Sequence, residues 1–317
     1  MSEFILGVDI GGTSIRFCIY NVAQDCVEGS LVKRTFIHLE HAAAEVEANL
    51  FQPIDQIVQS YETAGIRLRA IGVSSAALFD RKHGVITVWP NNPLWNGFPL
   101  RTCLEQRYHV NVYMEDDSNC AALGEQWKGR GARLHSFIYI TLSTGISCGI
   151  ITDDQLYPGK HGWAGEIGHI AMLENGPTCV CGKKGCLQAL ASGPAIVSAY
   201  CEQSGIDPAL ISLEELAKRA SANDIAALEA FRKAGHYVAR MIEILVAVLD
   251  IDSIVIGGGV LKAGEFYKAI LEEATDNLLG NTRKVDILFS ELQDLNGIYG
   301  AVKLCMDKDI NINHYQD

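Results

Sequence analysis

The sequence Phe4-Ile-Leu-Gly-Val-Asp-Ile-Gly-Gly-Thr13 joins an apolar run to a turn that contains one acid and two glycines. The run predicts a buried β-strand over 4–8, and residues 15–20 predict its antiparallel partner. Glycines let backbone N–H groups approach phosphate oxygens, and a hydroxyl can add a donor. The turn therefore predicts a nucleotide-phosphate site made of Asp9, Gly11, Gly12 and Thr13, with Asp9 acting on a hydrated Mg²⁺. An ordinary hairpin turn, which commonly uses Asp and Gly, is the alternative interpretation.

A similar arrangement returns in the second half of the chain. A strand predicted over 137–142 leads into Ser143-Thr144-Gly145, and a partner strand is predicted over 148–152. A strand predicted at 254–256 ends in a third turn, Gly257-Gly258-Gly259. This repetition predicts two similar α/β halves, each of which donates a phosphate-facing turn to a shared cleft. The candidate nucleotide-binding residues of these later turns are Thr144, Gly145, Gly258 and Gly259.

Length and composition restrict the class of protein. The 317 residues exceed one comfortable core and predict two domains, and 48% hydrophobic with 20% charged residues is typical of a soluble globular protein. The net charge of −12 argues against a nucleic-acid partner, because phosphate binding needs a basic patch. No apolar run approaches the roughly 20 residues of a membrane helix. We expect the first residues to form a strand and not a signal peptide, and the ten cysteines to be mostly reduced thiols in a cytoplasm.

Four nitrogen and sulfur ligands lie near one another in the sequence: His169, Cys179, Cys181 and Cys186. This is the number that a tetrahedral structural zinc site needs. Gly182 and Gly185 are expected to let the backbone turn tightly between the last two sulfurs. Glu166 precedes the histidine by three residues, so a zinc ion would stiffen a loop whose polar residues can face a small-molecule substrate. Three free cysteines and a packed histidine are the alternative interpretation.

Asp117 is the candidate general base. It lies between a strand predicted over 110–114 and a helix predicted over 118–127, where the helix dipole keeps a carboxylate ionised. Phosphoryl transfer needs a positioned hydroxyl, a proton acceptor and charge compensation more than covalent chemistry. The alternative interpretation of Asp117 is an ordinary helix N-cap.

Together these motifs resemble the ROK family of sugar kinases, over nearly the whole chain from Asp9 to about Met306. The most specific part is Gly162-Trp-Ala-Gly-Glu-Ile-Gly-His169 followed by Cys179-x-Cys181-Gly-x-x-Gly-Cys186. The resemblance implies an α/β, two-domain, actin-like and hexokinase-like ATPase fold with ribonuclease H-like halves, and binding of ATP and sugar in the interdomain cleft. We expect a small domain over 1–116 and about 296–317, and a large domain with the zinc-binding loop over 117–295.

The same resemblance implies a role for each candidate residue. Asp117 is the base that accepts the proton of the sugar hydroxyl. The sugar-facing positions are Asn92, Asp116, Glu166, His169 and Gln188, of which His169 also matches a zinc-ligand position. The nucleotide side is formed by Asp9, Gly12, Thr13, Thr144, Gly145, Gly258 and Gly259. The implied partners are a sugar and ATP, and members of the family commonly form homodimers.

Several positions depart from the family pattern. Asp116 replaces an asparagine, so an amide becomes a carboxylate that only accepts hydrogen bonds when ionised. Gln188 replaces a glutamate, Ala76-Ala77 replace Pro-Gly, and Ser14 replaces a lysine. Asp116 and Gln188 lie where sugar hydroxyls should be recognised. These departures therefore affect the expected identity of the sugar more than the expected class of reaction.

The leading hypothesis is an ATP-dependent enzyme that phosphorylates the 6-hydroxyl of an aldohexose. Ile15 to Cys18 and the residues after Ala76 look like allose kinases, whereas Ala189 to Gly193 looks like N-acetylmannosamine kinases. D-Allose is slightly favoured, with N-acetylmannosamine and glucose as alternatives. A sugar-responsive repressor is disfavoured by the acidic charge and the short segment before Asp9. A non-catalytic sugar-binding protein is disfavoured by the intact Asp9, Asp117 and Thr144.

Overall fold

The computed structural model describes residues 2–89, 92–279 and 283–314. The chain divides into two compact units: Met1–Lys128 with Leu295–Asp317, and Gly129–Asp294. The boundary expected at 116/117 lies one helix before the observed division. That helix, α4 (Asp117–Lys128), belongs to the first unit because it packs along α10 (Asn296–His314).

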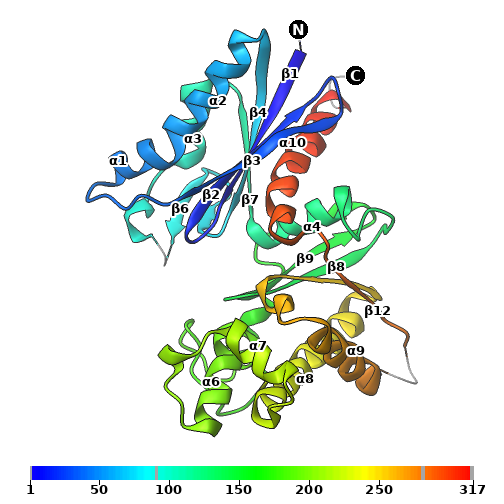
Figure 1. Ribbon diagram of the computed structural model, residues 1–317. Coiled ribbons are helices and arrows are strands. Elements are labelled where there is room, and N and C mark those ends of the chain that lie inside the picture. Colours follow the sequence, from blue (N-terminus) through cyan, green and yellow to red (C-terminus); the bar gives the residue numbers. More distant parts are fainter. Residues whose placement is uncertain (1, 90–91, 280–282, 315–317) are drawn as a thin grey trace. The chain divides into compact units, whose positions relative to one another are not determined.

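A five-stranded mixed sheet forms the centre of the first unit (Figure 1). Its strand order is β3-β2-β1-β4-β7, with β1, β4 and β7 parallel and β2 and β3 antiparallel to their neighbours. The strands are β1 (Ser2–Ile10), β2 (Ser14–Asn21), β3 (Cys26–Thr35), β4 (Ile66–Ser75) and β7 (Asn111–Asp116). The strands predicted over 4–8, 15–20 and 110–114 are confirmed. The observed β1 and β2 extend beyond both predicted ends, and β7 begins at Asn111 and extends to Asp116. A separate hairpin, β5 (Leu78–Asp80) and β6 (Val85–Val88), had no sequence prediction.

The second unit repeats this topology with a sheet ordered β10-β9-β8-β11-β12. Again three antiparallel strands are followed by two parallel ones. The strands are β8 (Phe137–Leu142), β9 (Ile146–Thr152), β10 (Gln155–Leu156), β11 (Ser253–Gly257) and β12 (Asp286–Phe289). The prediction of two similar α/β halves is therefore confirmed at the level of strand order and direction.

Alternating side chains of β1 enter two different cores of the first unit. Phe4, Leu6 and Val8 pack into a cluster that also contains residues of the helical segment after β3, whereas Ile5 packs with α10. Figure 1 shows α2 and α3 on one side of the sheet and α10 on the other. The covering helices are α1 (Ala42–Val46), a π-helical turn (Glu47–Phe51), α2 (Gln52–Thr63) and α3 (Leu100–Tyr108). Both sheet faces are therefore buried, as expected for strands with parallel neighbours.

Two glycines let α4 and α10 touch backbone to backbone. An added Cβ at Gly124 would lie 2.0 Å from the Asn296 carbonyl oxygen, and one at Gly300 would lie 1.6 Å from that of Cys120. No real side chain fits at such a distance, so this helix pair depends on both glycines.

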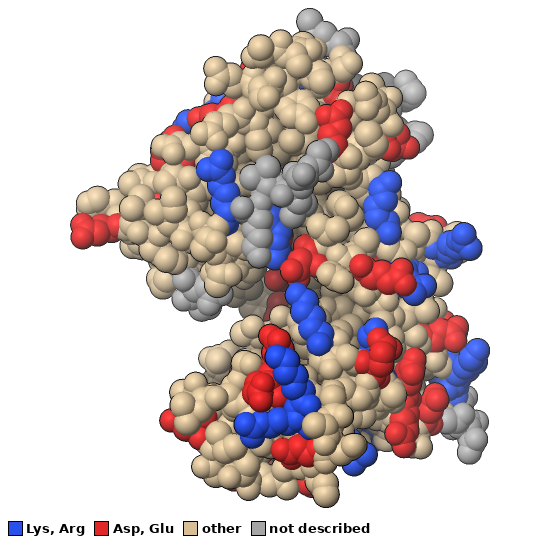
Figure 2. Space-filling model, in the orientation of Figure 1, with Lys and Arg blue, Asp and Glu red and all other residues tan. Residues whose placement is uncertain are grey.

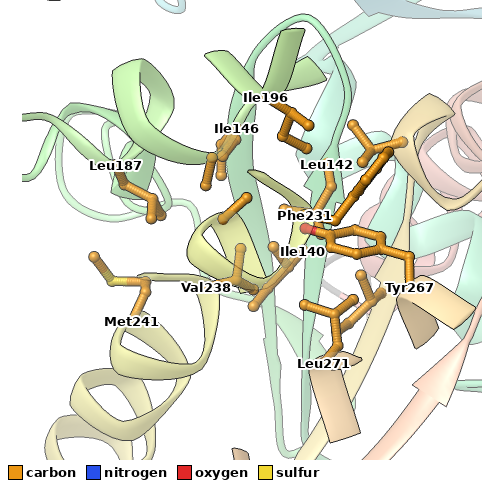
Figure 3. Packing of buried hydrophobic residues seen from close by; sticks show 14 of the residues in the cluster. Ile140, Leu142, Ile146, Leu187, Ile196, Phe231, Val238, Met241, Tyr267 and Leu271 are labelled. Carbon is orange, nitrogen blue, oxygen red and sulfur yellow. The ribbon is translucent and has the colours of Figure 1, made fainter. Parts of the chain in front are cut away.

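Within the described part of the second unit, five α-helices accompany the sheet: α5 (Leu187–Ala191), α6 (Gly193–Ser204), α7 (Leu213–Ser221), α8 (Ile225–Leu249) and α9 (Glu265–Leu279). Figure 3 shows Ile140 and Leu142 of β8 packed near Phe231 and Val238 of α8 and Tyr267 of α9. The buried residues of α8 therefore form part of the core of this unit. The Ser212 hydroxyl accepts a hydrogen bond from the Glu215 N–H, so Ser212 is the N-cap of α7.

The surface carries charges of both signs. On the face shown in Figure 2, Lys and Arg side chains lie among Asp and Glu side chains. Over the part of the chain that the structure describes, no helix has the length and apolar character required to cross a membrane.

Candidate functional site

Polar residues of the first unit meet at the carboxyl ends of its three parallel strands. Asp9 of β1 pairs in register with Ser74 of β4, and Ser74 pairs in turn with Glu115 of β7. Ser75 and Asp116 follow one position later. Ligands of open α/β sheets bind at this edge, so the sheet places these side chains where a substrate would approach.

Asp9 is buried and already has two partners. Its Oδ2 accepts a hydrogen bond from Arg16 Nη1 over 2.7 Å, and its Oδ1 accepts one from Ser74 Oγ over 2.8 Å. A hydrated Mg²⁺ at this position would share the carboxylate with a guanidinium. Arg16 was not identified from the sequence, although the hairpin register sets it directly opposite Asp9.

The turn after β1 is a tight hairpin turn. The Gly11 N–H donates to the Ser14 carbonyl over 3.0 Å, so this donor is already used within the turn. The Phe36 N–H donates to the Thr13 carbonyl over 3.1 Å, and the Thr13 side chain is exposed. Of the predicted phosphate contacts, the geometry is therefore most favourable for the Thr13 hydroxyl and least favourable for the Gly11 N–H.

The junction of β7 and α4 places the candidate base. Asp116 Oδ1 accepts hydrogen bonds from the Asn119 N–H over 2.9 Å and from Ser118 Oγ over 2.7 Å. This is the pattern of an N-cap, so the cap of α4 is Asp116. The interpretation of Asp117 as the cap is wrong by one residue. Asp117 is the first residue of α4, where the helix dipole favours a carboxylate, and its side chain is exposed.

Asp116 is surrounded by donors. Besides the two capping bonds to Oδ1, its Oδ2 accepts from Asn119 Nδ2 over 2.6 Å and from Arg81 Nη2 over 3.0 Å. A carboxylate offers about four lone-pair positions, so these bonds leave little acceptor capacity for a sugar hydroxyl.

One arginine links the two acids that precede the base. Arg81 donates to both carboxylate oxygens of buried Glu115 as well as to Asp116. Burial raises the pKa of Glu115, but the hydrogen bonds from Arg81 and Asp116 and the positive charge of Arg81 together outweigh it and lower that pKa overall. Burial and the negative charge of Glu115 raise the pKa of Asp116 well above its usual range.

Asn92, a predicted sugar contact, is buried in a polar cluster that the sequence did not indicate. Its Nδ2 donates to Glu45 Oε1, which also accepts from Trp95 Nε1 over 3.1 Å. The Leu39 N–H donates to Glu45 Oε2 over 2.9 Å. Since a carboxylate only accepts, Asn92 must turn its amide nitrogen toward Glu45. The amide atom that remains for a sugar hydroxyl is Oδ1.

In the second unit, two of the predicted glycine turns lie side by side. Ser143 N–H donates to the Gly145 carbonyl over 3.0 Å and closes the turn after β8. Gly258 has a φ of 99°, and an added Cβ there would lie 2.3 Å from the Leu142 carbonyl oxygen. Only glycine fits at this contact, which places the turn after β11 against the end of β8. The structure thus brings together Thr144, Gly145, Gly258 and Gly259.

Gln188 supports the turn after β8 from α5. Its Oε1 accepts a hydrogen bond from the Ile146 N–H over 3.3 Å and lies 3.3 Å from the place of a Cβ on Gly145. Its carbonyl oxygen therefore contacts the protein backbone, which leaves its amide nitrogen as the group suited to a sugar hydroxyl.

The four predicted zinc ligands converge in the second unit. Their ligand atoms all lie within 4.8 Å of one another. His169 Nδ1 and Cys179 Sγ are 3.5 Å apart, and Cys181 Sγ and Cys186 Sγ are 3.7 Å apart. In a tetrahedral zinc site, Zn–S bonds near 2.3 Å and Zn–N bonds near 2.05 Å place a nitrogen and a sulfur ligand about 3.5 Å apart. Two sulfur ligands are then about 3.8 Å apart. The donor set therefore fits zinc in both chemistry and spacing.

Local backbone geometry explains why this loop closes. Gly182 and Gly185 both have positive φ values, 86° and 67°, as the sequence predicted for a tight turn between the sulfurs. His169 ends a short 3₁₀ turn (Ile167–His169) and directs Nδ1 toward Cys179. Its other nitrogen, Nε2, lies 4.0 Å from Glu166 Oε2, and the Glu166 side chain is half exposed. A metal ion held here would fix the orientation of the ring that faces Glu166.

The predicted site residues thus form two sets, one in each unit. The first unit contains Asp9, Gly11, Gly12, Thr13, Asn92, Asp116 and Asp117. The second contains Thr144, Gly145, Glu166, His169, Cys179, Cys181, Cys186, Gln188, Gly258 and Gly259.

Comparison with known proteins finds related sequences and structures. A model of the ROK family matches residues 5–308. A glucokinase from Halalkalibacterium halodurans is 32% identical over 83% of this chain and 82% of its own length. A xylose repressor from Caldicellulosiruptor bescii is 25% identical over 98% of this chain and 80% of its own length.

Two crystal structures share the fold closely. A ROK hexokinase from Thermus thermophilus has a TM-score of 0.83 and 31% identity, over 96% of this chain and 99% of that one. A ROK glucokinase from Streptomyces griseus, solved with glucose and AMPPNP, has a TM-score of 0.77 and 28% identity, over 95% of this chain and 98% of that one.

Proposed function

Because the chain belongs to the ROK family and has its two-domain, actin-like and hexokinase-like ATPase fold, we propose that it is an ATP-dependent sugar kinase. It transfers the γ-phosphoryl group of ATP to the 6-hydroxyl of an aldohexose or N-acetylhexosamine. The observation that carries this proposal is the exposed carboxylate of Asp117, held as the first residue of α4 at the carboxyl end of β7.

In this reaction Asp117 accepts the proton of the sugar 6-hydroxyl as the phosphoryl group arrives. The paired glycine turns of the second unit bind nucleotide phosphate through backbone N–H groups and the Thr144 hydroxyl. Asp9 orients the water shell of Mg²⁺, and Arg16 holds Asp9 in place. Mg²⁺, when bound with ATP, neutralises charge on the transferring group. Asn92, Glu166, His169 and Gln188 hold the sugar.

His169, Cys179, Cys181 and Cys186 hold a structural zinc ion in this proposal. The ion orders the loop that carries Glu166, so its contribution is to sugar binding and not to proton transfer. We also propose that the protein is a cytoplasmic homodimer that binds neither nucleic acid nor a membrane. Sedimentation of the purified protein tests its oligomeric state.

The sugar remains the open part of the proposal. Both the H. halodurans relative and the S. griseus structure are named glucokinases, which supports an aldohexose substrate. The resemblance of Ile15 to Cys18 to allose kinases has no counterpart among these relatives. Initial rates of ADP release with glucose, D-allose, mannose and N-acetylmannosamine at saturating Mg-ATP identify the substrate.

The same assay tests the base. Replacement of Asp117 by Asn should lower kcat by about 10²–10⁴-fold, the usual contribution of a general base, with little change in the free energy of unfolding. Glu105, a partly exposed acid on α3, provides a control outside the proposed site through Glu105→Gln. Near-normal turnover of Asp117→Asn would show that another group accepts the proton.

A sugar-responsive regulator is the second candidate, because the xylose repressor similarity covers almost the whole chain. Calorimetry that detects sugar binding, together with no ADP release for any sugar, would favour this candidate over the kinase.

A further inference from the structure

Arg81 lies between β5 and β6, in a hairpin for which the sequence gave no functional motif. Its guanidinium contacts both oxygens of Glu115, and its Nη2 lies 3.0 Å from Asp116 Oδ2. These acids are the last two residues of β7, directly before Asp117. One side chain therefore connects the hairpin to the strand end that carries the proposed base.

The hairpin is itself held in place. Arg101 of α3 donates through Nη2 to the Arg81 carbonyl oxygen over 3.1 Å, and the Arg101 N–H donates to the Gly84 carbonyl oxygen over 3.2 Å. Arg81 retains 28% side-chain exposure, whereas Glu115 retains only 6%. A buried carboxylate such as Glu115 needs a partner, and a two-pronged guanidinium contact is the geometry that best supplies one.

Charge balance at this edge depends on the same arginine. Three acids follow one another from Glu115 to Asp117, and the thiol of Cys120 on α4 also lies close to Glu115 and Asp116. Asp9 of β1, the remaining nearby acid, is paired with Arg16 of β2. Arg81 is in contact with both Glu115 and Asp116.

We propose that Arg81 is a positioning residue for phosphoryl transfer: it neutralises Glu115 and Asp116, and it fixes Asp116 as the cap that begins α4 at Asp117. This inference rests on the proposed role of Asp117 as the base. It also assigns Asp116 a structural task, since the donors around its carboxylate leave little capacity for a sugar hydroxyl.

Kinetics in two charge backgrounds test the proposal. The first background is the native protein, and the second carries Glu115→Gln with Asp116→Asn, which removes both charges but keeps acceptor oxygens. Arg81→Met in the native background should lower kcat by about 10-fold to 100-fold, the cost of a displaced catalytic group. In the neutral background the same substitution should cost less than about 3-fold, because the charges that Arg81 compensates are gone.

The pH dependence separates positioning from a merely structural role. Arg81→Met leaves negative charge uncompensated, which favours protonation of the neighbouring acids, so the acidic limb of the kcat/KM profile should move to higher pH. Arg81→Lys keeps the charge but loses the two-pronged contact. This variant should lower kcat while the acidic limb stays in place, and it replaces Arg81→Met if the latter does not fold. Lys82→Met, on the exposed neighbouring residue, is the control and should match the wild type.

A folded Arg81→Met protein with wild-type kcat and pH profile would overturn the proposal. An equal loss of kcat in both backgrounds would also overturn it, since charge compensation would then have no part. These outcomes differ from failure of the proposed function, which would appear as a wild-type protein that phosphorylates no sugar.

Discussion

Removal of one zinc ligand should weaken the metal site and, through it, sugar binding. Cys186 is the best position to change, because its side chain is fully buried in the cluster and has its Sγ 3.7 Å from that of Cys181. Structural zinc sites bind with about 10–16 kcal/mol, so an equal share for one of four ligands is roughly 3 kcal/mol. Cys186→Ser should therefore weaken zinc binding by about 100-fold or more.

The assay has three readouts. Elemental analysis of the wild type should give one zinc per chain, and competition with a chromogenic chelator should give the affinity of each variant. Hydrogen exchange should increase over 166–193 in Cys186→Ser, and KM for the sugar should rise more than KM for ATP. Cys103→Ser, a half-buried cysteine on α3, is the matched control. Freshly purified wild type without zinc, or Cys186→Ser with wild-type zinc affinity, would refute the reasoning.

Three further predictions concern stability. The Tyr267 hydroxyl is buried with no hydrogen-bond partner among the described residues, so Tyr267→Phe should raise the free energy of unfolding by up to about 1 kcal/mol in urea titrations. Gly300→Ala would force a Cβ to within 1.6 Å of the Cys120 carbonyl oxygen; it should lower the free energy of unfolding by about 2 kcal/mol or more and reduce the soluble yield. The hydrogen bond from Arg107 lowers the pKa of Asp55, so its contribution to stability is present at neutral pH and is lost as pH falls below the ordinary Asp range. Between about pH 5 and pH 2, the free energy of unfolding should decline less steeply for Asp55→Asn than for the wild type.

Local sequence patterns predicted most of the fold. The apolar run before Asp9 and the apolar run over 137–142 are each short and continuous, so their strands follow from nearby residues. The cluster of His169, Cys179, Cys181 and Cys186 was predictable for the same reason, because its three cysteines lie within a single short loop.

Contacts between distant residues account for what the sequence did not predict. Arg81 contacts Glu115 across 34 positions of sequence, and Glu45 contacts Asn92 across 47 positions. No local sequence pattern therefore predicts the contacts of Arg81 or Glu45. The domain boundary depends on α10, which comes from the far end of the chain and keeps α4 in the first unit. The cap of α4 differed by one residue because acids stand at both positions of the junction.

The route of the chain through the first unit has a consequence for synthesis on the ribosome. The unit contains both ends of the described chain, and Gly129–Asp294 are translated before α10 exists. At about 5–20 residues per second, this interval is on the order of 10–30 s. During it, Ile5 and Ala70 lack the side chains of Ile298, Val302 and Cys305, which complete their cluster from α10. The nascent protein therefore leaves part of an apolar sheet face uncovered until α10 has been translated.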